Sequence, residues 1–133
     1  MNVYMKEAIK EAEKGMRHNS GGPFGVVIVR NGKVIAKGHN SVLETNDPTA
    51  HAEINAIRKT SKKLKTFDLS DCEIYSTCEP CPMCLGAVHW AKMKKMYYGC
   101  TQRDAAKIGF DDKFIYDVIR GTAKKPQVQM IQI

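Results

Sequence analysis

Two short segments, His51-Ala52-Glu53 and Pro80-Cys81-Pro82-Met83-Cys84, constrain this chain more than any other feature. They supply one histidine and two cysteines, the nitrogen and sulfur ligands that zinc prefers. A zinc ion with three protein ligands keeps a fourth position open for water, as catalytic zinc sites do. Glu53 then remains as an unattached carboxylate. The fold must therefore bring the two segments together around one ion.

The spacing within each segment suits that chemistry. Cys81 and Cys84 stand three apart at a predicted helix start, which places both side chains on one face, about 5–6 Å apart. The positive end of a helix dipole lowers thiol pKa values and favours the thiolates that zinc needs. His51 and Glu53 are two apart and diverge around a helix. The histidine can bind metal while Glu53 takes a proton from water, whose pKa a catalytic zinc brings to about 7.

Other interpretations of the cysteines stay open at this stage. Cys78 is a candidate fourth ligand for a structural zinc, and it completes the C-x₂-C-x₂-C spacing that opens a bacterial ferredoxin run. The fourth cysteine of such a run is absent, since Val88 occupies its place. Cys72 and Cys100 are expected to be small buried core residues. On the predicted helix after Cys81, His89 and Trp90 are expected to pack rather than to bind metal.

Composition bounds the class of protein. The 133 residues suit one domain, 1–133, and 43% hydrophobic with 26% charged residues is typical of a soluble globular chain. No apolar run approaches the roughly 18 residues of a membrane span, and the N-terminus lacks a signal-peptide core. Five cysteines, an odd number, argue against a disulfide framework. We therefore expect a cytoplasmic protein with no membrane partner.

The net charge of +7 has two interpretations. A basic chain is typical of proteins that bind nucleic acid. A lysine-rich solvated surface gives the same charge, and only five of the 21 basic residues are arginine, the residue suited to bidentate phosphate contacts. The composition favours the solvated surface and leaves a nucleic-acid partner open.

Hydrophobic periodicity and turn residues predict alternating helices and strands. The helices are expected at 3–14, ending near Gly15, from Asp47-Pro48 through His51 and Glu53, at 82–91 and at 114–120. The strands are expected at 25–29, 34–38, 72–76, 95–98 and 128–133, with Asn31-Gly32 as a hairpin turn. An opening hairpin followed by crossover helices predicts a mixed sheet with helices on its faces.

The motifs resemble those of a known superfamily. His-Ala-Glu and Pro-Cys-x-x-Cys are the signature of the zinc deaminases that act on nucleobases. Within this cytidine-deaminase-like superfamily the chain most resembles the bacterial guanine deaminases. The matching segments are Gly21 to Gly25, Asn46 to Glu53, Cys78 to Ala87, Asp104-Ala105-Ala106 and Gly109-Phe110-Asp111-Asp112. The last of these distinguishes the chain from the tRNA adenosine deaminases, which resemble it up to Trp90.

The resemblance implies a three-layer α/β/α cytidine-deaminase-like fold with a central mixed five-stranded sheet. It implies one catalytic Zn²⁺ per chain. The metal ligands would be His51, Cys81 and Cys84, and Glu53 would shuttle protons. Asn40 would hydrogen-bond the base and Asp112 would recognise the guanine edge, although Asp112 can also be interpreted as a helix cap. Phe24 would either pack on the ring or serve as a core aromatic residue.

The implied reaction is hydrolytic deamination of guanine to xanthine and ammonia. The alternatives are adenosine-to-inosine editing of tRNA, deamination of guanosine or of a cytosine-type substrate, and a non-enzymatic zinc-bound interaction module. By the same resemblance we expect a homodimer. Family members continue beyond the position of Ile133 with a segment exchanged between subunits. In this sequence that segment is expected to be missing, through a shortened chain or an omitted tail.

Overall fold

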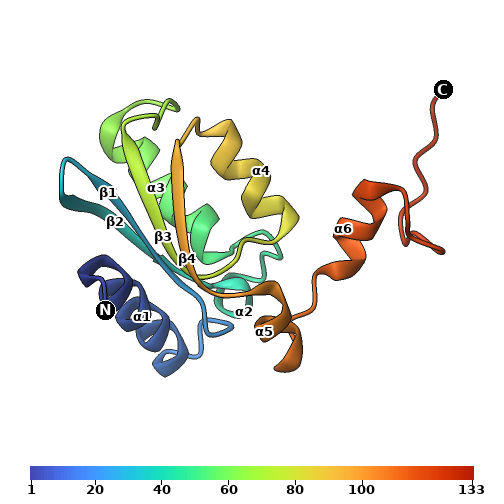
Figure 1. The fold of residues 1–133 in the computed structure, drawn as a ribbon, viewed down its shortest axis with the longest axis horizontal. Helices are drawn as coiled ribbons and strands as arrows, with labels where there is room; N and C mark the ends of the chain where they lie inside the picture. The colour runs from blue at the N-terminus through green and yellow to red at the C-terminus, as the bar shows by residue number, and fades with distance from the viewer.

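The centre of the computed structural model is a four-stranded mixed sheet in the order β2-β1-β3-β4 (Figure 1). Strand β1 pairs antiparallel with both β2 and β3, whereas β3 and β4 are parallel. The strands are β1 Gly25–Arg30, β2 Lys33–His39, β3 Cys72–Cys78 and β4 Lys95–Cys100. The predicted mixed sheet is therefore confirmed.

Helices cover both faces of this sheet (Figure 1). The helices of the chain are α1 Val3–Arg17, α2 Val42–Thr45, α3 Ala52–Leu64, α4 Pro82–Trp90, α5 Gln102–Lys107 and α6 Lys113–Arg120, and of these α1 covers one face of the sheet while α3 and α4 cover the other. Alternation along β1 divides the core, because Val27 and Val29 pack with Ala8 of α1 while Val26 and Ile28 pack with α3 and α4. The result is a three-layer α/β/α arrangement. No helix is both long enough and apolar enough to cross a membrane.

Two glycines have different roles in the fold: Gly32 forms a turn, and Gly15 allows close packing. Asn31 and Gly32 have φ values of 51° and 73°, as a type I′ hairpin turn requires, so the predicted turn is confirmed. The predicted helix end at Gly15 is wrong, because α1 continues to Arg17. A Cβ at Gly15 would lie 2.8 Å from the His39 ring. This glycine therefore permits α1 to approach β2 rather than ending the helix.

The predicted helix start at Asp47-Pro48 is also wrong. Helix α3 begins at Ala52, and His51 is its N-cap. The Asp47 carboxylate accepts hydrogen bonds from the backbone N–H and the hydroxyl of Thr49, at 2.8 and 2.7 Å. These bonds form a local turn that competes with the helix. The loop before this turn contains the one-turn helix α2, which the sequence patterns did not predict.

The predicted fifth strand at 128–133 is absent, so the expected five-stranded sheet is corrected to four strands. This segment and α6 lie on an arm that projects from the body of the molecule (Figure 1). Met130 is 92% exposed, and its apolar neighbours are exposed as well. Apolar and β-branched residues favour a strand only where a neighbouring strand and a packed face receive them. Neither is present beside this segment.

Candidate active site

The N-termini of α3 and α4 meet at the C-terminal end of β3, and this junction forms the site. His51 and Cys81 are the N-cap residues of the two helices, both with extended backbone and neither with a side-chain cap hydrogen bond. An N-cap side chain normally bonds to the first free N–H groups of its helix. Here both side chains face each other instead. Cys84, in the first turn of α4 and fully buried, joins them.

These three side chains fit a zinc ion. His51 Nδ1 lies 3.5 Å from Cys81 Sγ and 3.5 Å from Cys84 Sγ, and the three donor atoms all lie within 4.8 Å of one another. Ordinary Zn–N and Zn–S bonds at a tetrahedral angle separate nitrogen from sulfur by about 3.6 Å. The donor set and its spacing therefore suit one Zn²⁺ with an open fourth position.

Cys78 does not belong to this donor set. Its sulfur points to the Thr101 carbonyl oxygen, at 3.9 Å, and burial raises its pKa to about 12. A buried thiol with a raised pKa resists forming the thiolate that metals bind. The alternatives of a four-ligand structural zinc and an iron–sulfur cluster are therefore not supported by the geometry.

The electrostatics of the three ligands favour metal binding. The contact with Cys84 and the neighbouring His51 lower the pKa of the Cys81 thiol. The same contact and burial raise the pKa of the Cys84 thiol. Cys81 in turn raises the pKa of His51. Binding of a cation to this cluster releases the protons held by the thiol and imidazole groups.

Glu53 lies beside the three ligands and is 6% exposed. Its Oε1 accepts a 3.2 Å hydrogen bond from the Ser76 hydroxyl, and its Oε2 lies 3.3 Å from Cys84 Sγ. Burial raises the pKa of the carboxyl group, because the charged form loses its hydration. Ser76 was not predicted from the sequence. The sequence feature that could have indicated Ser76 is a hydroxyl side chain within strand β3, whose residues are mostly buried.

A cleft of about 380 Å³ opens beside Glu53 and the ligand cluster. This volume lies within the range of small-molecule sites. The lining contains four carboxylate residues and no lysine or arginine. The lining residues are Phe24, Asn40, Pro48, His51, Ala52, Glu53, Cys78, Glu79, Cys81, Met83, Ala105, Gly109, Phe110, Asp111, Asp112, Phe114 and Ile115.

Asn40 and Phe24 both line the cleft, as predicted for substrate-binding residues. Asn40 is 7% exposed, and its Oδ1 accepts a 3.1 Å hydrogen bond from Val42 N–H. The amide NH₂ is thus left as the donor toward the cleft. A Cβ at Gly21 would collide with Asn40 Oδ1, which explains the glycine there. The Phe24 ring packs edge-to-face on Phe110, with centroids 5.0 Å apart.

Asp112 occupies the N-cap position of α6, yet its side chain makes no capping hydrogen bond. Its Oδ1 atom is buried and has no hydrogen-bond partner. Burial also raises the pKa of this carboxyl group. An unpaired buried acceptor is costly unless a ligand pairs with it. Asp112 is nevertheless part of the cleft lining, and the helix-cap interpretation describes its position but not its bonding.

Three expectations about nearby residues are corrected or confirmed. Cys72 is buried, as expected, and its pKa is raised by burial to about 11. Cys100 is exposed, against expectation, because β4 is the edge of the sheet. His89 and Trp90 are outside the metal cluster but are exposed rather than packed, with Trp90 85% exposed. They lie on the outer face of α4, which nothing in this chain covers.

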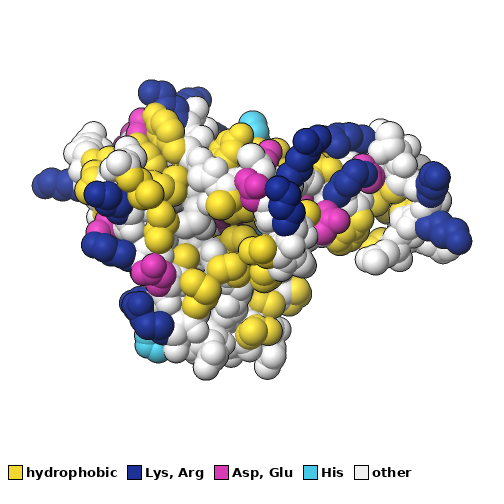
Figure 2. Space-filling model, turned by 60° about the horizontal axis from the view of Figure 1, so that its bottom comes forward, with side chains coloured by type: hydrophobic (Ala, Val, Ile, Leu, Met, Phe, Trp, Pro, Cys, Tyr) yellow, Lys and Arg dark blue, Asp and Glu magenta, His cyan; other side chains and the backbone are white.

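The basic residues lie away from the cleft. Figure 2 shows dark blue side chains at the edges of the body and along the projecting arm. None of them belongs to the cleft lining. The net charge of +7 is therefore carried by the outer surface and not by the site.

Three side chains placed to bind one metal ion, at two helix N-termini, lie beside a buried glutamate and a cleft, which is the arrangement of the zinc-dependent deaminases. Residues 1–100 match the family model of the cytidine and deoxycytidylate deaminase zinc-binding region. The chain belongs to this family, and its α/β cytidine-deaminase-like fold and zinc-dependent deaminase class are confirmed.

Individual relatives refine this placement. The chain is 48% identical to the guanine deaminase of Bacillus subtilis over 98% of its own length and 84% of the relative. The solved structure of that guanine deaminase superposes with a TM-score of 0.93, covering 100% of this chain and 86% of the other. NE0047 in complex with 2,6-diaminopurine is 30% identical, with a TM-score of 0.79, covering 91% of this chain and 70% of the other. The tRNA-specific adenosine deaminase of Aquifex aeolicus is 39% identical over 75% of this chain and 66% of its own length.

Proposed function

We propose that this protein hydrolyses guanine to xanthine and ammonia. The observation that carries the substrate choice is the carboxyl group of Asp112, which lines the cleft and has one oxygen without a hydrogen-bond partner. An ionised carboxylate only accepts hydrogen bonds, and guanine presents ring N–H and exocyclic NH₂ donors on one edge. The similarity to the guanine deaminase of Bacillus subtilis over 98% of the chain supports the same substrate.

The metal ligands of this reaction would be His51, Cys81 and Cys84. Zinc bound there would lower the pKa of a water molecule to about 7 and so would supply the nucleophile. Glu53 would accept one proton of the attacking water as the water oxygen bonds to the amine-bearing ring carbon. Glu53 then returns the proton to the adjacent ring nitrogen. Glu53 would then move the second proton, from the newly attached hydroxyl group, to the amine, so that the C–N bond breaks, ammonia leaves and the oxygen becomes a carbonyl.

Several other side chains support these steps. The Ser76 hydroxyl orients the Glu53 carboxylate. Burial of Glu53 raises the pKa of its carboxyl group and so its affinity for the proton that Glu53 must carry. The Asn40 NH₂ group hydrogen-bonds an acceptor of the base, and Asp112 accepts from the donor edge. Phe24 and Phe110 form an apolar wall against which a planar ring can pack.

Editing of tRNA is the main alternative, motivated by the net charge and by the tRNA-specific relatives. Binding of nucleic acid depends on lysine and arginine contacts to phosphates. A cleft with four carboxylates and no basic lining residue disfavours a polyanion at the reacting centre. The composition of the cleft therefore supports a small neutral base over a nucleic acid.

The test is a substrate panel. Zinc-loaded protein is incubated separately with guanine, guanosine, cytosine, adenosine and a tRNA, and ammonia and the deaminated product are measured. We expect xanthine from guanine, with kcat/KM for guanine at least about 100-fold above that for each other substrate. Inosine in tRNA, or turnover of guanosine or cytosine without turnover of guanine, would reject the proposed substrate. Absence of any turnover would support the non-enzymatic interaction module.

We further propose that the protein acts as a homodimer. A shallow groove of about 580 Å³ lies between α4 and α6, lined by Pro82, Leu85, Gly86, His89, Trp90, Tyr116 and Ile119. Contiguous exposed apolar surfaces of this kind are typical of association sites. Light scattering after size exclusion is expected to give twice the chain mass. Substitution of Trp90 by serine is expected to shift the population to monomer, and a wild-type monomer at micromolar concentration would contradict the proposal.

A further inference from the structure

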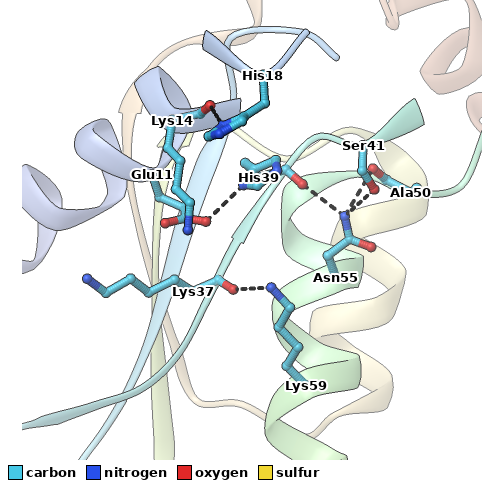
Figure 3. Close-up of polar contacts among 9 residues, drawn as sticks. All are labelled: Glu11, Lys14, His18, Lys37, His39, Ser41, Ala50, Asn55 and Lys59. Carbon is cyan, nitrogen blue, oxygen red and sulfur yellow. Dashed lines mark hydrogen bonds and ion pairs between the residues drawn. The ribbon is translucent and has the colours of Figure 1, made fainter. Parts of the chain in front are cut away.

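One side-chain amide connects helix α3 to the end of β2 and to the residue that precedes His51. Asn55 is half-buried on α3, one turn after His51. Its Nδ2 donates to the His39 carbonyl oxygen at 2.8 Å and to the Ser41 hydroxyl oxygen at 2.9 Å, and it lies 3.4 Å from the Ala50 carbonyl oxygen. Figure 3 shows the three acceptors converging on this nitrogen from the end of β2 and from the loop that follows it.

These acceptors are the immediate neighbours of residues at the site. His39 and Ser41 flank Asn40 in the chain, and Ala50 directly precedes His51. The Ser41 N–H also donates to the Ala50 carbonyl at 2.9 Å, which closes the loop between them. Asn55 is therefore in contact with both ends of the segment that carries Asn40, although it does not line the cleft itself.

The end of β2 is fixed from both faces of the sheet. On the other face, His39 Nδ1 lies 2.8 Å from Glu11 Oε1 of α1, as Figure 3 also shows. Together Glu11 and Asn55 fix His39 on both sides. The next residue in the chain is Asn40, so its direction depends on these contacts.

Lys59 provides an internal comparison. It lies on α3 one turn beyond Asn55, and its Nζ donates to the Lys37 carbonyl oxygen at 3.0 Å (Figure 3). Both side chains thus link α3 to the backbone of β2. The acceptors of Asn55 adjoin cleft residues. The single acceptor of Lys59, the Lys37 carbonyl oxygen, lies at an exposed residue of the strand.

We propose that Asn55 is a positioning residue that sets the Asn40 amide against the bound base. The inference rests on the proposed function, because it assigns Asn40 to substrate binding. A neutral amide NH₂ supplies two hydrogens to acceptors at three positions. Aspartate, of nearly the same shape, would place acceptor oxygens against those same acceptors. Loss of the donors releases the turn at 39–41, while His51 stays fixed by its helix and its metal.

The test compares Asn55→Asp and Asn55→Leu with the matched control Lys59→Met. For both Asn55 variants we expect KM for guanine to rise roughly tenfold and kcat to change less than about threefold, since binding geometry is lost and not the reacting groups. Zinc content is expected to stay at one per chain, and the absorption spectrum of the Co²⁺-substituted protein is expected to match wild type. Lys59→Met is expected to keep the wild-type KM.

An unchanged KM with a lowered melting temperature would reduce Asn55 to a structural role and overturn the inference. So would a fall in kcat with zinc loss, which would place its effect on His51. Hydrogen exchange measured by mass spectrometry tests the same contacts without substrate. Faster exchange over residues 40–50 in both variants, with residues 33–37 unaffected, supports the inference even if guanine proves not to be the substrate, and unchanged exchange over 40–50 overturns it.

Discussion

Residues 1–100 and residues 101–133 contribute different kinds of residue to the site. Residues 1–100 contain the sheet, the core clusters, the three candidate metal ligands and Glu53. Residues 101–133 contain one buried residue, Ala105, yet they contribute Asp112, Phe110 and Phe114 to the cleft. The family model matches the first part alone. Under the proposed function, the reacting groups and Asn40 belong to the packed body, whereas further contacts to the base come from the less buried C-terminal part.

Packing explains why the two parts can differ in this way. The metal ligands and Glu53 start from helices fixed on a dense core, where a small displacement is costly. Helix α6 has no buried residue, and the Tyr116 hydroxyl, which donates to the Pro80 carbonyl at 2.7 Å, is its one hydrogen bond to the body. Changes in the C-terminal part are therefore expected to alter affinity for the base with little effect on the fold.

The largest effect is expected from removal of a metal ligand in the body. Cys84→Ala leaves two donors, and we expect zinc content to fall to near zero and deamination to be lost. The loss should exceed the roughly 10–100-fold cost of removing a supporting contact around a metal. Elemental analysis and ammonia release measure both. Cys100→Ala removes an exposed thiol and is expected to keep both properties, and a zinc-replete, active Cys84→Ala protein would contradict the ligand assignment.

Glu53→Gln tests the proton carrier without disturbing the metal. The amide cannot accept and return protons, so kcat is expected to fall by about 10²–10⁴-fold while one zinc per chain is retained. The matched control is Glu44→Gln on the exposed surface, which is expected to leave kcat unchanged. Retention of more than a tenth of the wild-type kcat by Glu53→Gln would show that another group moves the protons.

Asp112→Asn tests the C-terminal part. Replacing one acceptor oxygen by an NH₂ donor opposes the donor edge of guanine, and KM is expected to rise about 10–100-fold, as for a lost hydrogen bond between a charged group and its partner. Zinc content and melting temperature are expected to stay near wild type. Asp111→Asn is the comparison, since its Oδ1 already accepts from Lys113 N–H, and it should raise KM less. Equal effects would place recognition on the charge of the segment rather than on Asp112.

The smallest effect is expected from Tyr116→Phe, which removes the hydrogen bond between α6 and Pro80. A single neutral hydrogen bond contributes about 0.5–1.5 kcal/mol, so KM is expected to rise by about two- to tenfold with an unchanged melting temperature. Tyr98→Phe removes an exposed hydroxyl from β4 and serves as the control. A loss of melting temperature as large as that of a core substitution would show that the arm is part of the body.

Sequence patterns predicted the body well and the C-terminal part less well. The hairpin at Asn31-Gly32 and the helix start at Cys81-Pro82 were predicted correctly, because both depend on local backbone preferences. The helix start at Asp47-Pro48 and the strand at 128–133 were predicted wrongly. In the first case the bonds from Asp47 to Thr49 formed a turn instead. In the second, apolar residues had no neighbouring strand to pair with.

The sequence by itself determined the metal donor set, since the residue types and spacing of His51, Cys81 and Cys84 suit zinc, and it predicted Glu53 as the proton carrier. Only the tertiary structure showed the hydrogen bond from Ser76 to Glu53, the bond from Asn55 to the residue before Asn40, and the unpaired oxygen of Asp112. The physical reason is the separation along the chain of the residues that interact. Ligand spacing and helix starts depend on neighbours within a turn, whereas these contacts join segments far apart in the chain, which only folding brings together.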